Sequence, residues 1–183
     1  MYFLAVLAPP EVNEKVLQWK HYMRDHFGCV VALRSPAHIT LMPPFWMDEK
    51  LETELTIDIS SFASRNLPFE IELENFDAFK PRVIFLHVNE TRELNELKTE
   101  LEGFLLSKEK YPIKKESRTF HPHVTIANRD LLKKDFSEAF NHFQRIEYKR
   151  AFAVDEIAIM KHLDGEWKAI QRLGLNGPLE NNC

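Results

Sequence analysis

The sequence contains little cysteine, which excludes disulfide-stapled scaffolds and cysteine-based zinc sites. Cys29 and Cys183 are the only cysteines among 183 residues, and both classes need more thiols than two. Long hydrophobic runs are missing as well, since no run approaches the roughly 18 apolar residues of a membrane span. The apolar residues 1–8 are too few for a signal peptide and precede two prolines. We therefore expect a soluble, cytoplasmic protein that has no membrane partner.

Glycine is scarce too, and neither sign of charge dominates. The five glycines form no glycine-rich phosphate loop. Lys and Arg number 24 against 28 Asp and Glu, which leaves a formal net charge of −4. A protein that coats nucleic acid by bulk electrostatics would be strongly basic, but this composition still allows recognition of a single phosphate. The hydrophobic fraction of 44% suffices for a packed core in one domain, or in two small lobes that share a core.

Helical and extended patterns alternate along the chain. Apolar residues at helical spacing predict four helices, over about 12–27, 48–62, 91–105 and 130–143. Gly28 is the expected stop of the first helix, while Asp48 and Asp130 are the expected caps of the second and fourth. Shorter runs predict strands at 2–7, 30–33, 37–42, 69–74, 82–88, 123–127, 150–161 and 167–173. The last two form a hairpin around Asp164-Gly165, and this mixture favours an α+β fold with antiparallel sheets.

Two tetrapeptides share one pattern, His-x-Thr followed by an aliphatic residue. They are residues 38–41 (His-Ile-Thr-Leu) and 123–126 (His-Val-Thr-Ile). Because side chains alternate between the two faces of a strand, His38 and Thr40 share one face, roughly 7 Å apart, as do His123 and Thr125. The aliphatic neighbours then point into the core. The alternative interpretation is two half-buried strands whose histidines are only hydrogen-bonded.

A pair of imidazoles with nearby hydroxyls suits phosphoryl transfer without a metal. One imidazole takes a proton from the attacking hydroxyl or water, while the other protonates the leaving oxygen. The two threonine hydroxyls hold the non-bridging phosphate oxygens as charge develops. This chemistry requires the two rings to face one another across a single cleft. The near equivalence of the two motifs leaves open which histidine is the base.

The second motif in its context reads Arg118-Thr-Phe120-His-Pro-His123-Val-Thr125-Ile. Together with the first motif, it resembles the two-histidine (2H) phosphoesterases of the LigT-like group, also called the 2′-5′ RNA ligase family. The resemblance covers most of the chain, because the opening strand, the strand after Pro81 and the last hairpin match as well.

The resemblance implies a bilobal α+β fold with two pseudo-symmetric lobes of antiparallel β-sheet, helices on the outside and a central cleft. Residues 1–183 would form a single domain of two intertwined lobes, each with one His-x-Thr motif. It also implies a 2′,3′-cyclic phosphodiesterase that needs no metal or cofactor and leaves a 2′-phosphate, with 2′-5′ RNA ligation in some members. Catalysis is carried over to His38, Thr40, His123 and Thr125 only.

The chain departs from the family pattern near the expected substrate. After the first motif it reads Met-Pro-Pro-Phe-Trp over residues 42–46, where better-known members continue with a Phe-Leu-Gly type segment. The basic residue expected just past the second motif is displaced to Arg129. The candidate substrate contacts are a stacking side chain, two phosphate-binding arginines, a third arginine at the start of a strand, and a cleft wall: Phe120, Arg118, Arg129, Arg82 and Phe45. Each has a plain alternative as a packed or solvated side chain.

The remaining alternatives concern a metal and the type of activity. His121 and His123 could share an ion, but no motif supplies a third ligand, so we predict no metal site. We expect a monomer that acts on an RNA terminus or a small cyclic nucleotide. The alternatives to hydrolysis are 2′-5′ RNA ligation and a nucleotide- or RNA-binding module without turnover.

Overall fold

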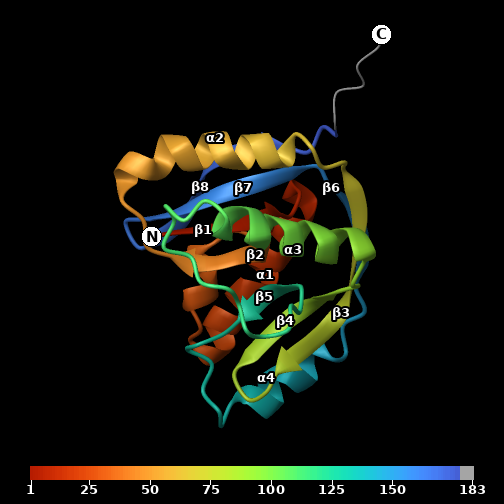
Figure 1. Ribbon diagram of the computed structural model, residues 1–183. Coiled ribbons are helices and arrows are strands. Elements are labelled where there is room, and N and C mark those ends of the chain that lie inside the picture. The colour runs from red at the N-terminus through yellow and green to blue at the C-terminus, as the bar shows by residue number, and fades with distance from the viewer. Residues whose placement is uncertain (178–183) are drawn as a thin grey trace.

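Two four-stranded antiparallel sheets with the same arrangement form the framework (Figure 1). The computed structural model describes residues 1–177. Sheet A has the order β2-β1-β7-β8 and sheet B the order β5-β4-β3-β6. Their strands are β1 (Tyr2–Leu7), β2 (His38–Phe45), β7 (Glu156–Leu163) and β8 (Glu166–Gly174), and β3 (Phe69–Phe79), β4 (Val83–Val88), β5 (His123–Ala127) and β6 (Lys149–Val154). Each His-x-Thr motif thus lies on an edge strand, and the predicted bilobal α+β fold is confirmed.

The helices begin and end at recognisable signals. They are α1 (Pro10–Phe27), α2 (Glu52–Ala63), α3 (Arg92–Leu106) and α4 (Phe136–Phe143), with short 3-10 helices η1 (Val31–Arg34) and η2 (Glu49–Leu51). Gly28 ends α1 as predicted, because its φ of 70° is left-handed and its N–H bonds to the carbonyl of Arg24. Thr91 caps α3 by accepting from the N–H of Leu94. Asp48 caps η2, which leads directly into α2.

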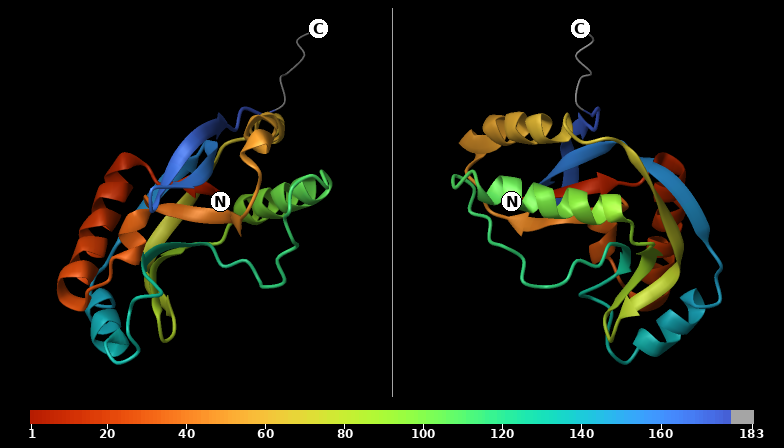
Figure 2. Two further views of the ribbon diagram at one scale, coloured as in Figure 1. Left: turned by 90° about the vertical axis from the view of Figure 1, so that its left-hand side faces the viewer. Right: turned by 45° about the vertical axis from the view of Figure 1, so that its right-hand side comes forward.

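Two of the helices that join strands of one sheet, α1 and α3, pack against the other sheet. α1 joins β1 to β2 of sheet A, yet its Trp19 meets Phe76 of β3 edge-to-face at 4.9 Å, and α1 also contacts β5. α3 joins β4 to β5 of sheet B and contacts β2 of sheet A. In the left view of Figure 2, α1 and α4 lie on one side of the sheets and α2 and α3 on the other. A helix from each half therefore contacts a strand of the other sheet.

The element order repeats once along the chain. β1-α1-β2-α2-β3 is followed by β4-α3-β5-α4-β6, and the hairpin β7-β8 then returns to sheet A. The His-x-Thr strand is the second strand of each repeat and precedes a helix both times, as predicted. These crossings between sheets agree with a single domain over residues 1–183, which stays a prediction.

Both faces of β1 are buried, which explains its continuous apolar run. Tyr2, Leu4 and Val6 belong to the main hydrophobic core that extends through the molecule. Phe3 and Ala5 point the other way and form a small second cluster with residues of β7. This second cluster lies on the face of sheet A that carries His38, so the His38 side chain lies beside packed apolar residues.

The predicted strand at 150–161 is wrong as one element, because the chain leaves one sheet for the other at Asp155. β6 pairs with β3 in sheet B, and β7 pairs with β1 in sheet A. The carbonyl of Asp155 between them accepts from the N–H of Leu175 at 2.7 Å. Strand periodicity continues across the bend, so the pattern does not show the change of sheet.

The expected strand at 30–33 and the expected cap at Asp130 are also wrong, because these two segments contact each other. Residues 31–34 form η1, and the carboxylate of Asp130 accepts from the N–H groups of Val30 and Val31 at 2.6 and 2.8 Å. Asp130 thus caps η1 rather than the fourth helix, which begins only at Phe136. Leu132, expected on the buried face of that helix, is 54% exposed.

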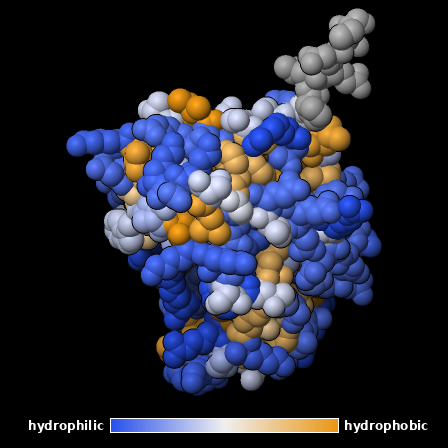
Figure 3. Space-filling model, in the orientation of Figure 1, coloured by the Kyte–Doolittle hydropathy of each residue, from blue (hydrophilic) through white to orange (hydrophobic). Residues whose placement is uncertain are grey.

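On the face that Figure 3 presents, most residues are hydrophilic, and the hydrophobic residues form small separate groups. None of the helices within residues 1–177 is long and apolar enough to cross a membrane. Cys29 is a buried free thiol, whereas Cys183 lies outside the described residues.

Candidate functional site

A cavity of about 390 Å³ brings the two motifs together from the two sheets. His38 and Thr40 of β2 line it from sheet A, and Thr125 of β5 lines it from sheet B. β2 and β5 are edge strands in contact with each other. The cavity is thus the central cleft that the sequence predicts between the lobes.

The predicted alternation of side chains is confirmed in both motifs. The aliphatic residues Ile39 and Leu41 are buried, as are Val124 and Ile126, whereas the histidine and threonine of each motif are only half-buried. The neighbouring central strand sets the register, because Thr40 lies opposite Ala5 of β1, and Thr125 opposite a residue of β4. Each motif therefore presents an imidazole and a hydroxyl on the open face of its strand.

Both imidazoles are oriented in the same way by backbone. The Nδ1 of His38 donates to the carbonyl of Pro36 at 2.8 Å, and the Nδ1 of His123 donates to the carbonyl of His121 at 2.7 Å. A carbonyl only accepts, so Nδ1 carries the proton in each neutral ring. The Nε2 atom of each ring is left with a free lone pair, which is the form that can accept a proton from a reactant.

Burial makes both rings hard to protonate. It lowers the pKa of His38 to about 4, and the charges of Lys20 and His123 act in the same direction. Burial likewise lowers the pKa of His123. A positive charge on His123 thus makes protonation of His38 less favourable. A negative phosphate between the two rings would instead favour the protonated form of either ring.

Each imidazole also packs against a phenylalanine from the next strand of its sheet. The ring of His38 lies 4.9 Å from that of Phe3 on β1. The ring of His123 lies 5.0 Å from that of Phe85 on β4 and 5.1 Å from that of Phe79. This packing restricts the rotation of both imidazoles and completes the similarity between the two half-sites.

Among the four motif residues, His123 alone does not line the cavity. His38, Thr40 and Thr125 line it, while His123 stands two residues before Thr125 on the same face of β5. Its carbonyl partner, His121, lies on the loop that enters β5.

Of the five predicted substrate contacts, only Arg129 lines the cavity. Arg118 is 84% exposed at its side chain and forms an ion pair with Glu116 at 3.0 Å. Arg82 is exposed in the turn before β4, and Phe120 packs half-buried against the main core. Phe45 is only 7% exposed and lies against Tyr2 in the core.

Several residues that line the cavity were not predicted from the sequence. The most informative are Arg34, Pro44, Asn128, His162 and Trp167. A signal existed for one pair, because the two-residue turn at 164–165 sets His162 opposite Trp167 in the hairpin. Nothing in the sequence shows that this hairpin reaches the cleft. Asn128 has a buried side-chain oxygen without a hydrogen-bond partner in the described part of the chain.

No metal centre is evident near the motifs. Among residues 1–177 no three or more His, Cys, Asp or Glu side chains gather in a way that could hold a metal ion. His121 instead lies 3.9 Å from the carboxylate of Glu90, and both side chains are exposed.

Comparisons with known proteins support one assignment of family and fold. A protein of Geobacillus kaustophilus named "Putative phosphoesterase" is 22% identical over 179 residues, which cover 96% of each chain. A relative of the same name from Bacillus mycoides is 27% identical over 152 residues, covering 80% of this chain and 82% of its own.

Solved structures show the same fold over nearly the whole chain. The protein TT0787 of Thermus thermophilus has a TM-score of 0.71 at 22% identity, covering 96% of this chain and 98% of its own. Escherichia coli LigT complexed with 3′-AMP has a TM-score of 0.67 at 20% identity, covering 95% and 97%. LigT is also described in complex with ATP.

The sequence model of one family spans both half-sites. It describes the 2′-5′ RNA ligase superfamily and matches residues 8–166, a range that contains β2 and β5 with their motifs. With the fold and the paired motifs in agreement, the chain belongs to the 2′-5′ RNA ligase superfamily of phosphoesterases.

Proposed function

We propose that the protein is a metal-independent 2′,3′-cyclic phosphodiesterase that leaves a 2′-phosphate. The observation that carries this proposal is the meeting of two His-x-Thr strands, one from each sheet, around a single cavity. Each strand presents a ring whose Nδ1 is bound to backbone and whose Nε2 is free. Two such rings provide the base and the acid that opening a cyclic phosphate requires.

In the proposed reaction, the two histidines divide two proton transfers. The Nε2 of one ring accepts a proton from water as its oxygen bonds to phosphorus. The bond from phosphorus to the 3′ oxygen breaks, and the second ring, protonated beforehand, gives its proton to that oxygen. The products are a 2′-phosphate and a free 3′-hydroxyl, and the two rings exchange protonation states over one turnover.

Threonine hydroxyls and one arginine bind the phosphate in this proposal. Thr40 and Thr125 line the cavity from opposite sheets, so they can donate to different non-bridging oxygens. The guanidinium of Arg129 lines the same cavity and supplies positive charge without a metal. These groups stabilise the charge that builds up on the phosphate oxygens as water attacks.

A nucleotide or RNA terminus is the substrate class that we propose. The cavity wall includes Trp167 and His162 beside the phosphate-binding groups, and aromatic surfaces of this kind stack on nucleobases. The nucleotides named for the LigT complexes, 3′-AMP and ATP, support the same class for a protein of this fold.

2′-5′ RNA ligation is the second candidate, and the family name favours it. In 2′-5′ ligation the attacking group is an RNA 5′-hydroxyl instead of water, and a 2′-5′ linkage forms from the cyclic phosphate. The bond from phosphorus to the 3′ oxygen breaks as in hydrolysis, so the two rings keep their roles: one accepts the proton of the 5′-hydroxyl, and the other gives a proton to the 3′ oxygen.

The decisive experiment uses cyclic phosphates and identifies the product isomer. The protein is incubated with the four 2′,3′-cyclic mononucleotides and with a short RNA that ends in a cyclic phosphate, with and without EDTA. The proposal expects 2′-phosphate products, the same rates with the chelator, and a rate for His123→Ala that is lower by about 10²–10⁴-fold. Products that carry a 3′-phosphate would overturn it. Tight binding of these ligands without turnover would assign a binding module instead.

A further inference from the structure

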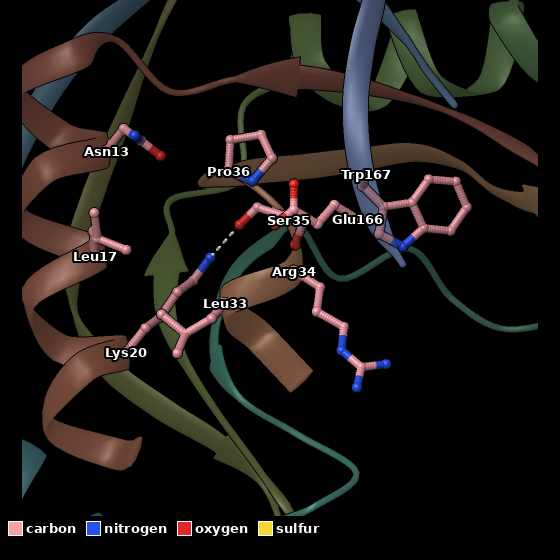
Figure 4. Close-up of a pocket in the computed structure, with 9 residues that line it drawn as sticks. All are labelled: Asn13, Leu17, Lys20, Leu33, Arg34, Ser35, Pro36, Glu166 and Trp167. Carbon is pink, nitrogen blue, oxygen red and sulfur yellow. Dashed lines mark hydrogen bonds between the residues drawn. The ribbon is translucent and has the colours of Figure 1, made fainter. Parts of the chain in front are cut away.

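A second, smaller cavity lies behind the segment that carries His38. It has a volume of about 210 Å³ and separates α1 from residues 33–36. Figure 4 shows Asn13, Leu17 and Lys20 projecting from α1 toward that segment. Arg34, Ser35 and Trp167 line both this cavity and the catalytic cleft. The segment is thus a thin wall between the two.

Asn13 holds the peptide group that orients His38. The N–H of Ala37 donates to the Oδ1 of Asn13 at 2.7 Å. The carbonyl of the same peptide group, that of Pro36, accepts from the Nδ1 of His38 at 2.8 Å. Because a peptide unit is planar and this one is trans, its N–H and C=O point in opposite directions. A bond on the N–H therefore fixes the direction of the carbonyl toward the imidazole.

Lys20 holds the preceding carbonyl. Its Nζ donates to the carbonyl of Ser35 at 2.9 Å, and the side chain is almost fully buried, with 3% exposed. Burial of the ammonium lowers its pKa to about 8, and no hydrogen-bonded carboxylate compensates for this cost among the described residues. On the other side, the carbonyl of Ala37 accepts from the N–H of Ala8 at 3.0 Å. Three successive peptide groups before His38 are thus held from outside the segment.

The second motif has no equivalent of the Asn13 contact. The carbonyl that orients His123 belongs to His121, and the next residue is Pro122, which has no N–H to anchor. The backbone-mediated connection from a helix side chain to the imidazole is therefore confined to His38.

We propose that Asn13 and Lys20 are positioning residues that hold His38 in the tautomer and orientation needed for proton transfer, an inference that rests on the proposed function. Asn13 acts through the Pro36–Ala37 peptide, and Lys20 keeps the preceding carbonyl from turning into the cavity. Neither residue touches the substrate. Their removal lowers kcat more than it changes KM, because the fault lies in proton transfer rather than in binding.

The test compares variants of Asn13 by imidazole nitrogen NMR and by steady-state kinetics. Asn13→Ala and Asn13→Leu remove the acceptor, while Asn13→Asp keeps an oxygen in its place. Gln18→Leu is the matched control, because Gln18 is an exposed amide on the same helix whose side chain bonds to Lys15 and to no other side chain among residues 1–177. In the wild type, the Nδ1 of His38 should give a protonated-type signal at neutral pH and its Nε2 an unprotonated-type signal.

The two variants that lack the acceptor should show a second tautomer of His38, and kcat should fall about 10-fold with KM within about twofold. Asn13→Asp should retain the wild-type signals, and Gln18→Leu should match the wild type in both measurements. Lys20→Met, compared with Lys15→Met on the exposed face, should give a smaller shift in the same direction.

Unchanged His38 signals in both folded Asn13→Ala and Asn13→Leu would overturn the positioning role even if the enzyme is a phosphodiesterase. A wild type that hydrolyses no cyclic phosphate would overturn the proposed function instead. In that case the NMR comparison still decides whether Asn13 sets the tautomer. Loss of activity in Gln18→Leu equal to that in Asn13→Leu would also count against the proposal, because it would show a general disturbance of α1.

Discussion

The two half-sites match in sequence and strand position, yet their surroundings differ. Each imidazole donates a hydrogen bond to the backbone carbonyl of the residue two positions earlier, and each packs against a phenylalanine of the next strand. The backbone before His38 is held by α1 side chains, whereas the carbonyl before His123 belongs to a peptide group without an N–H. The comparison teaches that a repeated motif can supply the same reactive groups with unequal support. The predictions below test how far the equivalence extends.

The largest effect should come from the imidazoles themselves. His38→Ala and His123→Ala should each lower kcat by about 10²–10⁴-fold, because each removes one proton carrier. The double variant should be little slower than the slower single variant, since the two rings act as a unit. Single-turnover hydrolysis of a 2′,3′-cyclic nucleotide measures this. Substantial activity in His123→Ala would mean that the site is misplaced, and circular dichroism of each variant controls for folding.

The threonines should matter less, and nearly equally. Thr40→Ala and Thr125→Ala each remove one contact to a phosphate oxygen, and we expect kcat to fall by about 10–100-fold in either case. Thr→Ser at the same positions keeps the hydroxyl and is the matched control. If one threonine proves dispensable while the other does not, the phosphate lies against one sheet only, and the symmetric binding proposed here is wrong.

Acid should destabilise the protein mainly through His38. Burial lowers the pKa of His38 to about 4 in the folded state, below the ordinary 6.5 that applies in the unfolded chain. Between these values the unfolded chain binds more protons, so stability is present above about pH 6.5 and is lost as the pH falls toward 4. From pH 7 to pH 5 this group alone should cost about 2 kcal/mol.

Urea unfolding at the two pH values measures that loss. His38→Gln should flatten the pH dependence more than His123→Gln, whose pKa burial also lowers. Equal flattening by the two substitutions would show that both rings are equally buried in solution, and the contrast between the half-sites would then be weaker than described.

The smallest of these effects concerns the connection between the halves. Asp130 follows the second motif and holds the N–H groups of Val30 and Val31, ahead of the first motif. Asp130→Ala should cost about 1–2 kcal/mol of unfolding free energy, typical of a lost helix cap. Asp135→Ala is the control, because Asp135 precedes α4 without capping it by its side chain. Equal losses from the two substitutions would show that the cap contributes nothing beyond the removal of an aspartate.

The parts of the fold that local pattern determines were predictable. The stop at Gly28, the buried strand 2–7 and the inward-facing aliphatic residues of both motifs follow from local geometry, and the structure has them. The bend at Asp155 and the cap formed by Asp130 depend on partners distant in sequence. Val30 lies 100 residues from Asp130, and no periodicity records such a contact.

The same division applies to the site. The four motif residues were predicted because their pattern carries the chemistry, and three of them line the cleft. Arg34 and Trp167 were missed, because their arrival depends on η1 and on the pairing of β7 with β1. Arg118 and Arg82 were predicted as substrate contacts, but neither lines the cavity. They have the right chemistry, but the structure places Arg118 beside Glu116 and Arg82 in an exposed turn.

The pairing of the first strand with a late one affects how the protein matures on the ribosome. Phe3 lies opposite Met160, so β1 cannot pair with β7 in sheet A until about 160 residues have been synthesised. Meanwhile α1 emerges before any part of sheet B, its packing partner, exists. Contacts of such long sequence separation slow folding and leave apolar segments exposed in the nascent chain. The cleft therefore forms only after β7 has been synthesised, and the apolar run at residues 2–7 is the segment that most needs protection during that interval.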